Sequence, residues 1–171
     1  MSNTNRIRCQ RILREAEGYL ELGLTQQALD TLERMTDPGT FKGHKLWIMG
    51  EVLRTLERYN EAAAVLEEAA DLAPSKVEVC LALAWCYKRT NRLEMAIATL
   101  ERARDVDADQ GIIHYNLACY HSLSHHKAEC LESLTKALAI QPEYRDMIAE
   151  ERDFDPLRSD ADFQSLTSII V

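Results

Sequence analysis

The segment Tyr59-Asn60-Glu61-Ala62-Ala63-Ala64-Val65-Leu66-Glu67-Glu68-Ala69 decides the fold of this chain. Its pattern of small and large apolar side chains returns when the sequence is shifted by 34 residues. The residues that align with Ala62 are also compact, namely Ala28, Ala96 and Cys130. Leucine recurs at the position of Leu66, as Leu32, Leu100 and Leu134. A fixed period of about 20–50 residues indicates a repeat protein, in which similar supersecondary structures stack on one another.

The residues upstream of this segment repeat in the same register. Gly50 aligns with Ala16, Ala84 and Ala118, so a small side chain recurs there as well. The alignment needs no gap and divides the chain into four repeats, 9–42, 43–76, 77–110 and 111–144. Within each half of a repeat, the apolar residues fall at i, i+3, i+4 and i+7, which is one face of an α-helix. Each repeat is therefore predicted to form two α-helices that pack closely through their small residues.

Local signals predict where some of these helices begin and end. Ser75 with Glu78, and Asn91 with Glu94, have the spacing of a capping box and predict helix starts. The segment Asp37-Pro38-Gly39 predicts that the second helix of the first repeat ends early, because proline cannot continue a helix.

A 34-residue helix–turn–helix pattern with these residue sizes resembles the tetratricopeptide repeat. The resemblance covers residues 9–144 and departs from the family at a few positions, such as Glu15 at a normally apolar site and His114 and His121 at sites of larger apolar residues. It implies an all-α fold, a right-handed superhelical solenoid of four antiparallel helix pairs. The array is predicted to span 1–144.

The pattern changes after Pro142, where the repeats end. We expect residues 145–171 to form C-terminal capping helices that pack on the last repeat, because the end of a solenoid otherwise exposes an apolar face. The last short helix is expected to present Phe163, Leu166 and Ile169. The alternative is a mobile tail that occupies a groove of the array.

Charge and cysteine content exclude several classes of partner. The formal net charge is −8 and the sequence pI is near 5.2, which is a poor match to a phosphate backbone, so we expect no nucleic-acid partner. The five cysteines are odd in number and form no CxxC pair, which favours a reducing compartment without disulfides. Charged residues interrupt every apolar stretch, so we predict a cytoplasmic protein with no signal peptide and no membrane partner.

The family resemblance also implies where a partner would bind, because the first helix of each pair lines the concave face. The candidate partner-binding residues follow the core positions by one and form one stripe on each first helix. They are Leu13 and Glu17; Trp47, Glu51 and Arg54; Leu81, Trp85 and Lys88; and Tyr115 and Cys119, with Leu20 and Ser122 completing the stripes. Trp47 and Trp85 fall on these stripes, although both could instead be core residues between neighbouring pairs. The Lys, Arg and Asn cluster with which some family members hold a C-terminal carboxylate is absent, since its positions hold Leu13, Glu17, Ile48, Glu78 and Ala82.

No residue pattern points to catalysis. His121 and His125 are spaced i, i+4 and could bind a metal on a helix, but His121 stands at an inward position and His125 at an expected turn. We therefore expect no enzyme activity, no cofactor and no metal site. The favoured function is a scaffold or adaptor that binds an apolar or amphipathic peptide or helix of another protein in the concave groove. The alternatives are a homo-oligomeric assembly scaffold with weak self-association, and a small cytoplasmic chaperone for a secreted or insoluble client.

Overall fold

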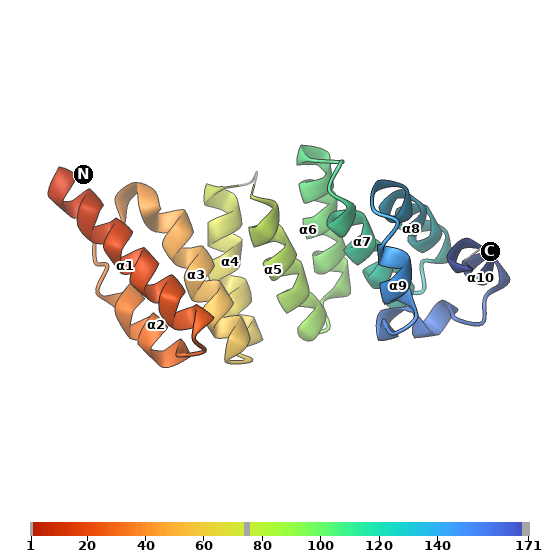
Figure 1. The fold of residues 1–171 in the computed structure, drawn as a ribbon, viewed down its shortest axis with the longest axis horizontal. Helices are drawn as coiled ribbons and strands as arrows, with labels where there is room; N and C mark the ends of the chain where they lie inside the picture. The colour runs from red at the N-terminus through yellow and green to blue at the C-terminus, as the bar shows by residue number, and fades with distance from the viewer. Residues whose placement is uncertain (1, 74–75, 169–171) are drawn as a thin grey trace. The chain divides into compact units, whose positions relative to one another are not determined.

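The computed structural model describes residues 2–73 and 76–168, which form helices joined by short turns and contain no strand (Figure 1). The prediction of an all-α fold is confirmed. Among the described residues, no helix is both long enough and apolar enough to span a membrane. The elements are α1 (Asn3–Glu21), α2 (Thr25–Glu33), the 3-10 helix η1 (Gly39–Phe41), α3 (Lys42–Thr55), α4 (Tyr59–Leu72), α5 (Val77–Arg89), α6 (Leu93–Val106), α7 (Gly111–Leu123), α8 (Lys127–Ile140), α9 (Tyr144–Ile148), the 3-10 helix η2 (Arg152–Leu157) and α10 (Ala161–Thr167).

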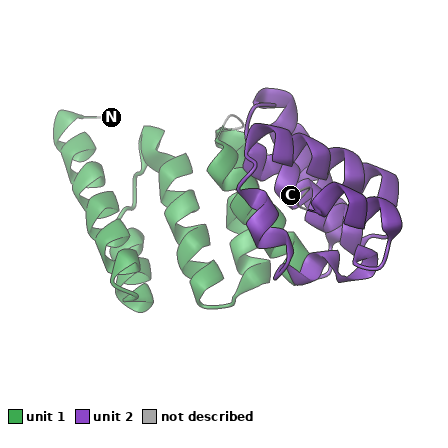
Figure 2. Ribbon diagram, turned by 45° about the vertical axis from the view of Figure 1, so that its right-hand side comes forward, with its two compact units in different colours: residues 1–90 green, residues 91–171 purple. Residues whose placement is uncertain are grey.

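The chain divides into two compact units, residues 1–90 and residues 91–171 (Figure 2). Unit 1 contains α1 to α5, and unit 2 contains α6 to α10. The boundary between the units falls within the third predicted repeat, 77–110, at the turn before α6. The sequence predicted a different division of the chain, into a repeat array over 1–144 and a cap over 145–171. That division remains a proposal.

The 34-residue register is visible in the backbone of the turns. Four residues spaced by 34 adopt the left-handed conformation, with φ between 57° and 71°, and they are Gly23, Glu57, Asn91 and His125. At Gly23, Glu57 and His125, the N–H of the following residue donates to the carbonyl five residues before it at 2.8–2.9 Å. The left-handed residue itself donates to the carbonyl three residues before it at 3.0 Å. This pair of bonds closes a helix C-terminus by satisfying its last carbonyls, so the first helices α1, α3 and α7 end in the same way.

These turns correct one of the predicted helix starts. Asn91 is the left-handed residue of its turn, and α6 begins at Leu93 with no side-chain cap, so the capping box of Asn91 with Glu94 is wrong. The reason is that Asn tolerates the left-handed conformation and is used here for that purpose. Ser75 of the other predicted box lies outside the described residues. The predicted early end of the second helix of the first repeat is confirmed. This helix, α2, has nine residues, whereas α4, the second helix of the next repeat, has fourteen.

Small residues set the approach of the paired helices. A Cβ atom added at Gly50 of α3 would lie 2.5 Å from Cγ and Cδ2 of Leu66 on α4, closer than real carbon contacts. The facing Leu66 is fully buried, as are the equivalent Leu32, Leu100 and Leu134. Leu66 therefore packs directly against Gly50, and the packing there leaves no room for a side chain.

Candidate functional site

The stripe residues of unit 1 lie on its three first helices. Glu17 belongs to α1, Trp47 to α3 and Trp85 to α5. Helix α3 contacts both α1 and α5, so the three stripes are neighbours. We call them together the unit 1 face, which consists of Glu17, Trp47, Glu51, Arg54, Leu81, Trp85 and Lys88, all of them half-buried.

Arginine side chains and aromatic rings contact one another at the α5 side of this face. The Arg54 guanidinium lies 5.0 Å from the ring centroid of Trp85, and the Tyr59 and Trp85 rings meet edge to face at 5.2 Å. The exposed Arg89 lies 4.9 Å from the Tyr59 ring and 5.5 Å from the Trp85 ring. Such contacts contribute about 0.5–1 kcal/mol each when exposed, and more when water is excluded. The cluster therefore holds the Trp85 ring in a fixed position on the face.

Glu51 fixes Arg54 in this cluster. The Arg54 guanidinium donates to the Glu51 carboxylate at 2.6 Å and 3.3 Å, a two-point contact within one helix. The hydrogen bond from Arg54 to Glu51 raises the pKa of Arg54, so its cation is retained at every physiological pH. Sequence reasoning missed Tyr59 and Arg89, because neither falls on the stripe. Tyr59 begins a second helix, and Arg89 ends α5 one residue beyond Lys88.

A pocket of about 490 Å³ opens beside Trp47 in unit 1. Trp47, Leu72 and Val79 provide its apolar wall, and Lys42, His44, Lys76 and Glu78 are among its polar residues. The His44 ring lies 5.6 Å from the Trp47 ring, and its Nε2 lies 2.8 Å from a carboxylate oxygen of Glu17 on α1. Trp47 also packs against the hydrophobic core of unit 1. Trp47 is therefore partly core and partly surface, and its role in partner binding remains a proposal.

Four of the stripe residues cannot line an open groove, which corrects their prediction. Leu13 is 3% exposed and belongs to the core of unit 1, while Tyr115, Cys119 and Ser122 of α7 are 4%, 2% and 0% exposed. Leu13 is buried because α1 turns this position towards the core residues of α2 and α3. Tyr115 and Cys119 are buried because the C-terminal segment of the chain covers them.

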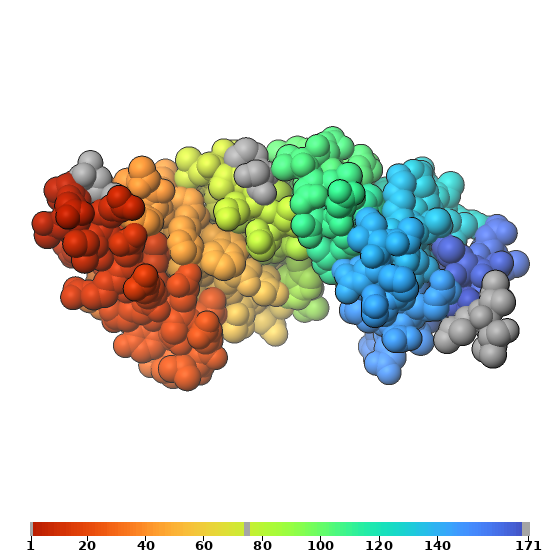
Figure 3. Space-filling model, turned by 45° about the horizontal axis from the view of Figure 1, so that its top comes forward, coloured from red at the N-terminus to blue at the C-terminus, as the bar shows by residue number. Residues whose placement is uncertain are grey.

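The C-terminal segment packs over α7 of unit 2, where η2 contacts α7 and α10 contacts α8. The Tyr115 ring stacks on Tyr144 at 4.8 Å and meets Phe154 edge to face at 5.8 Å. Phe154 in turn contacts the Phe163 ring at 5.4 Å. Figure 3 shows the blue C-terminal residues packed against the neighbouring helices of unit 2. Ile169, which was expected to join this layer, lies outside the described residues.

Polar contacts fasten the end of this segment. The Lys127 ammonium of α8 donates to Asp160 at 2.6 Å and to Asp162 at 2.8 Å. These hydrogen bonds raise the pKa of Lys127, and the bond from Lys127 lowers the pKa of Asp160. Arg145 donates to two backbone carbonyls, those of Leu166 and Ser168, at 3.0 Å each. The stripe of α7 is thus covered by the chain itself, whereas stripe residues of α1, α3 and α5 keep exposed surface.

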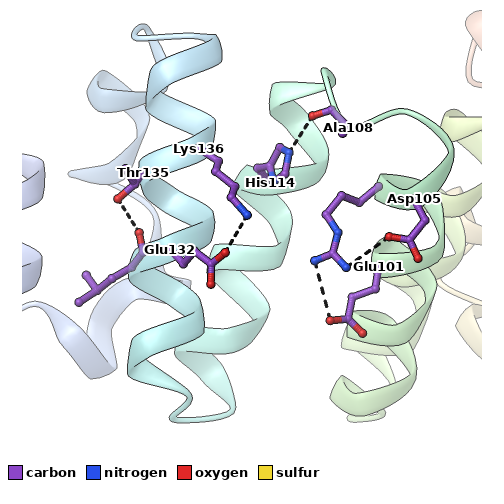
Figure 4. Close-up of polar contacts among 9 residues, drawn as sticks. Glu101, Asp105, Ala108, His114, Glu132, Thr135 and Lys136 are labelled. Atoms are coloured by element: carbon purple, nitrogen blue, oxygen red, sulfur yellow. Dashed lines mark hydrogen bonds and ion pairs between the residues drawn. The ribbon is translucent and has the colours of Figure 1, made fainter.

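A second groove lies among α6, α7 and α8 of unit 2 and has a volume of about 450 Å³ (Figure 4). Lys136 pairs with Glu132 at 2.7 Å, and Arg104 lies 4.0 Å from Glu101, each within its own helix. The buried His114 ring donates to a loop carbonyl 2.9 Å away. Because these charges are already compensated locally, the groove offers little to select a ligand.

His121 and His125, the histidines considered as metal ligands, lie in different environments. His121 is buried on α7, at the position that Tyr19 and Tyr87 hold in other repeats, whereas His125 is exposed in the left-handed turn. The His121 ring lies 5.8 Å from the His126 ring. His121 Nδ1 is buried without a hydrogen-bond partner.

We expect His121 to make unit 2 less stable in mild acid. Burial lowers the pKa of His121, and His126 lowers it further, against the opposing effect of Glu129, Glu101 and Glu94. The unfolded chain therefore binds the proton more readily, so the free energy of unfolding falls as the pH falls below about 6.5. Urea titrations at pH 7 and pH 5 measure this loss. The loss of stability between pH 7 and pH 5 should be smaller in His121→Tyr than in the parent chain. In the control His125→Asn it should equal the loss of the parent. A loss in His121→Tyr as large as that of the parent would contradict the assignment to His121.

Comparisons with known proteins bear on the repeats and on the fold. Residues 53–118 match the tetratricopeptide repeat family model. No curated protein matches the chain. Among solved structures, MamA residues 41 to the end from Desulfovibrio magneticus RS-1 is 17% identical with a TM-score of 0.72, covering 93% of each chain. TTC0263, a thermophilic tetratricopeptide-repeat protein of Thermus thermophilus, is 21% identical with a TM-score of 0.67, covering 87% of this chain and 81% of that one.

A further solved structure is that of YrrB, described as a tetratricopeptide-repeat protein with an unusual peptide-binding site. It is 22% identical to this chain with a TM-score of 0.70, and the match covers 79% of this chain and 70% of YrrB. At these identities the structural matches establish a shared fold, that of helical solenoids. The resemblance stated from the sequence is confirmed.

Proposed function

Since this chain is a tetratricopeptide-repeat protein by its matched residues and by its fold, we propose that it binds an apolar or amphipathic segment of another protein on the unit 1 face. Repeats of this family act as protein-interaction modules and are generally not enzymes, so the chain is a protein-interaction scaffold. YrrB, which has a similar fold, is described as having an unusual peptide-binding site. We also propose that the protein is cytoplasmic.

One observation carries the proposal. Trp47 and Trp85 lie on neighbouring helices of the same face, half-buried, with charged groups around them. Tryptophan and arginine are the residues most often found as energetic anchors of protein interfaces. The pocket beside Trp47 can take an apolar side chain, and the Arg89 guanidinium can meet a carboxylate of the partner.

The polar pairs on the face support its role in selecting a partner. Glu51 with Arg54 places charges of both signs beside Trp85. Glu17, which shares a hydrogen bond with His44, places a carboxylate near Trp47. Charges at the rim of an interface set the register of the bound segment and exclude like-charged competitors more than they add affinity. An amphipathic helix or strand with apolar anchors and mixed charges therefore fits better than a uniformly charged one.

We expect Trp47→Ala combined with Trp85→Ala to abolish partner binding. Affinity purification from native lysate with the intact chain identifies the partner by mass spectrometry, and a synthetic peptide of its binding segment is then titrated. Loss of two anchors of at least about 2 kcal/mol each lowers the affinity by more than about 100-fold. The control Leu22→Ala removes an apolar side chain that is exposed elsewhere in unit 1 and should leave the affinity unchanged.

Thermal unfolding separates this proposal from its alternatives. Retained helicity with lost binding supports the unit 1 face, whereas collapse of the fold in Trp47→Ala with Trp85→Ala would show that the rings are core residues. Undiminished binding by that variant would also contradict the proposal. Sedimentation of the pure chain at low and high salt tests the homo-oligomeric alternative, and co-expression with a captured client that is insoluble alone tests the chaperone alternative.

A further inference from the structure

Three potential metal ligands meet in unit 2, away from the unit 1 face in the sequence. Cys119 Sγ of α7 and carboxylate oxygens of Glu151 and Asp153 all lie within 4.8 Å of one another. Cys119 and Asp153 are buried, and Glu151 is half-buried. Glu151 precedes η2 and Asp153 lies within it, so the group joins α7 to the C-terminal segment that covers it.

Tyr115 supplies an independent sign that a ligand belongs here. It lies one helical turn before Cys119, is 4% exposed, and its hydroxyl is buried without a hydrogen-bond partner. A buried polar group left without a partner costs about 1–3 kcal/mol. The groups that act on this hydroxyl are Cys119, Glu151, Asp153 and Tyr144, each of which becomes negative on ionisation. The orphan oxygen therefore faces a cluster whose shared preference is for a cation.

We propose that Cys119, Glu151 and Asp153 bind a divalent cation of the zinc class, with the Tyr115 hydroxyl as a further oxygen donor. A thiolate with carboxylate oxygens suits Zn²⁺ and disfavours Mg²⁺ and Ca²⁺, which take oxygen ligands. At the usual Zn–S and Zn–O lengths of about 2.3 and 2.1 Å, tetrahedral ligand atoms lie roughly 3.5 Å apart. The ligand atoms lie within 4.8 Å of one another, so the side chains need to close by about 1.3 Å at most, within reach of rotamer adjustment.

The bound cation would clamp η2 against α7. One ligand comes from α7 and two come from the segment at η2, so the cation bridges two stretches that are 32 residues apart in the sequence, counted from Cys119 to Glu151. Such a bridge is the arrangement of a structural metal, which stabilises the folded chain by binding it and not the unfolded one. The site would thus strengthen the covering of the α7 stripe by the C-terminal segment.

The test uses the purified full chain, stripped of metal, and Co²⁺ as a spectroscopic probe. We expect one Co²⁺ per chain, with a thiolate-to-cobalt absorption band that Zn²⁺ displaces, and a higher melting temperature with Zn²⁺. Cys119→Ser should lose the band, and Cys119→Ser and Asp153→Asn should each weaken the Co²⁺ affinity by more than about 100-fold, since they remove ligands themselves. Cys130→Ser is the matched control, because Cys130 is a buried free cysteine of the same unit outside the group.

Absence of Co²⁺ binding by the intact chain would overturn the proposal, whatever the variants do. Persistence of the thiolate band in Cys119→Ser would overturn it as well. Far-UV circular dichroism without metal checks that each variant is folded. If Cys119→Ser or Asp153→Asn does not fold, Glu151→Gln replaces it, because the amide still accepts the Asp153 N–H bond that Glu151 makes at 3.1 Å. Co²⁺ affinity unchanged in Glu151→Gln would then count against the site.

Discussion

Replacing Phe154 with alanine lowers the free energy of unfolding of unit 2 by about 3–5 kcal/mol. Phe154 is 0% exposed and contacts the rings of Tyr115 and Phe163, which belong to α7 and α10. Its removal leaves a cavity between α7 and the C-terminal segment and breaks both ring contacts. We therefore expect the covering of the α7 stripe to loosen together with the loss of stability.

The distribution of tryptophan makes this effect measurable in the full chain. Trp47 and Trp85 both lie in unit 1, so tryptophan emission reports unit 1, while far-UV circular dichroism reports the helices of both units. In urea denaturation, Phe154→Ala should shift the dichroism transition. Met147→Ala, an exposed position on α9, should change it by less than about 0.5 kcal/mol. A Phe154→Ala variant as stable as the parent would contradict the packing of the C-terminal segment.

The second large effect is expected in unit 1, where Leu66→Ala should cost about 2–5 kcal/mol. Leu66 is fully buried and fills the space in front of Gly50. Gly50→Val should also destabilise, by about 1–3 kcal/mol, because even its Cβ would lie 2.5 Å from Leu66 atoms. Tryptophan emission during urea denaturation measures both variants.

The double variant Gly50→Val with Leu66→Ala tests the contact directly. The valine enters the volume that Leu66 vacates, so the double variant should be more stable than the sum of the two single effects predicts, by about 0.5–3 kcal/mol. Leu134→Ala, in the equivalent position of unit 2, is the control, since combining it with Gly50→Val should give additive losses. Additive losses in the Gly50 and Leu66 pair would show that α3 and α4 are not held by this contact.

The sequence predicts the helices well because their determinants are local and recur. The spacing of Leu32, Leu66, Leu100 and Leu134 places the second helices, and the small residues opposite them place the first helices. The start of α6 was misplaced because Asn91 suits both a helix cap and a left-handed turn, and only the backbone decides between them. The division into two compact units at residue 90 was not predicted, because no change in composition marks it in the sequence.

The candidate site was predicted in part, for a physical reason. Trp47, Arg54 and Trp85 follow from helical spacing, which is a local property. The burial of Tyr115 and Cys119 depends on Phe154 and its neighbours, which follow them by more than thirty residues and have no repeat counterpart to align with. Tyr59 and Arg89 were missed for the same reason, since they meet through a contact between separate segments. Likewise, Glu151 and Asp153 come close to Cys119 only because the chain folds back over α7.

The left-handed turn residues at positions 23, 57, 91 and 125 have a consequence for how such a chain can change in length. A deletion or duplication of 34 residues between two of these turns joins backbones of the same conformation, so every remaining helix keeps its inward face. A single inserted residue within a helix instead rotates all the following side chains by about 100° and turns core leucines outward. Gene rearrangements that add or remove one whole repeat are thus tolerated, while small frame-preserving insertions inside a helix are not.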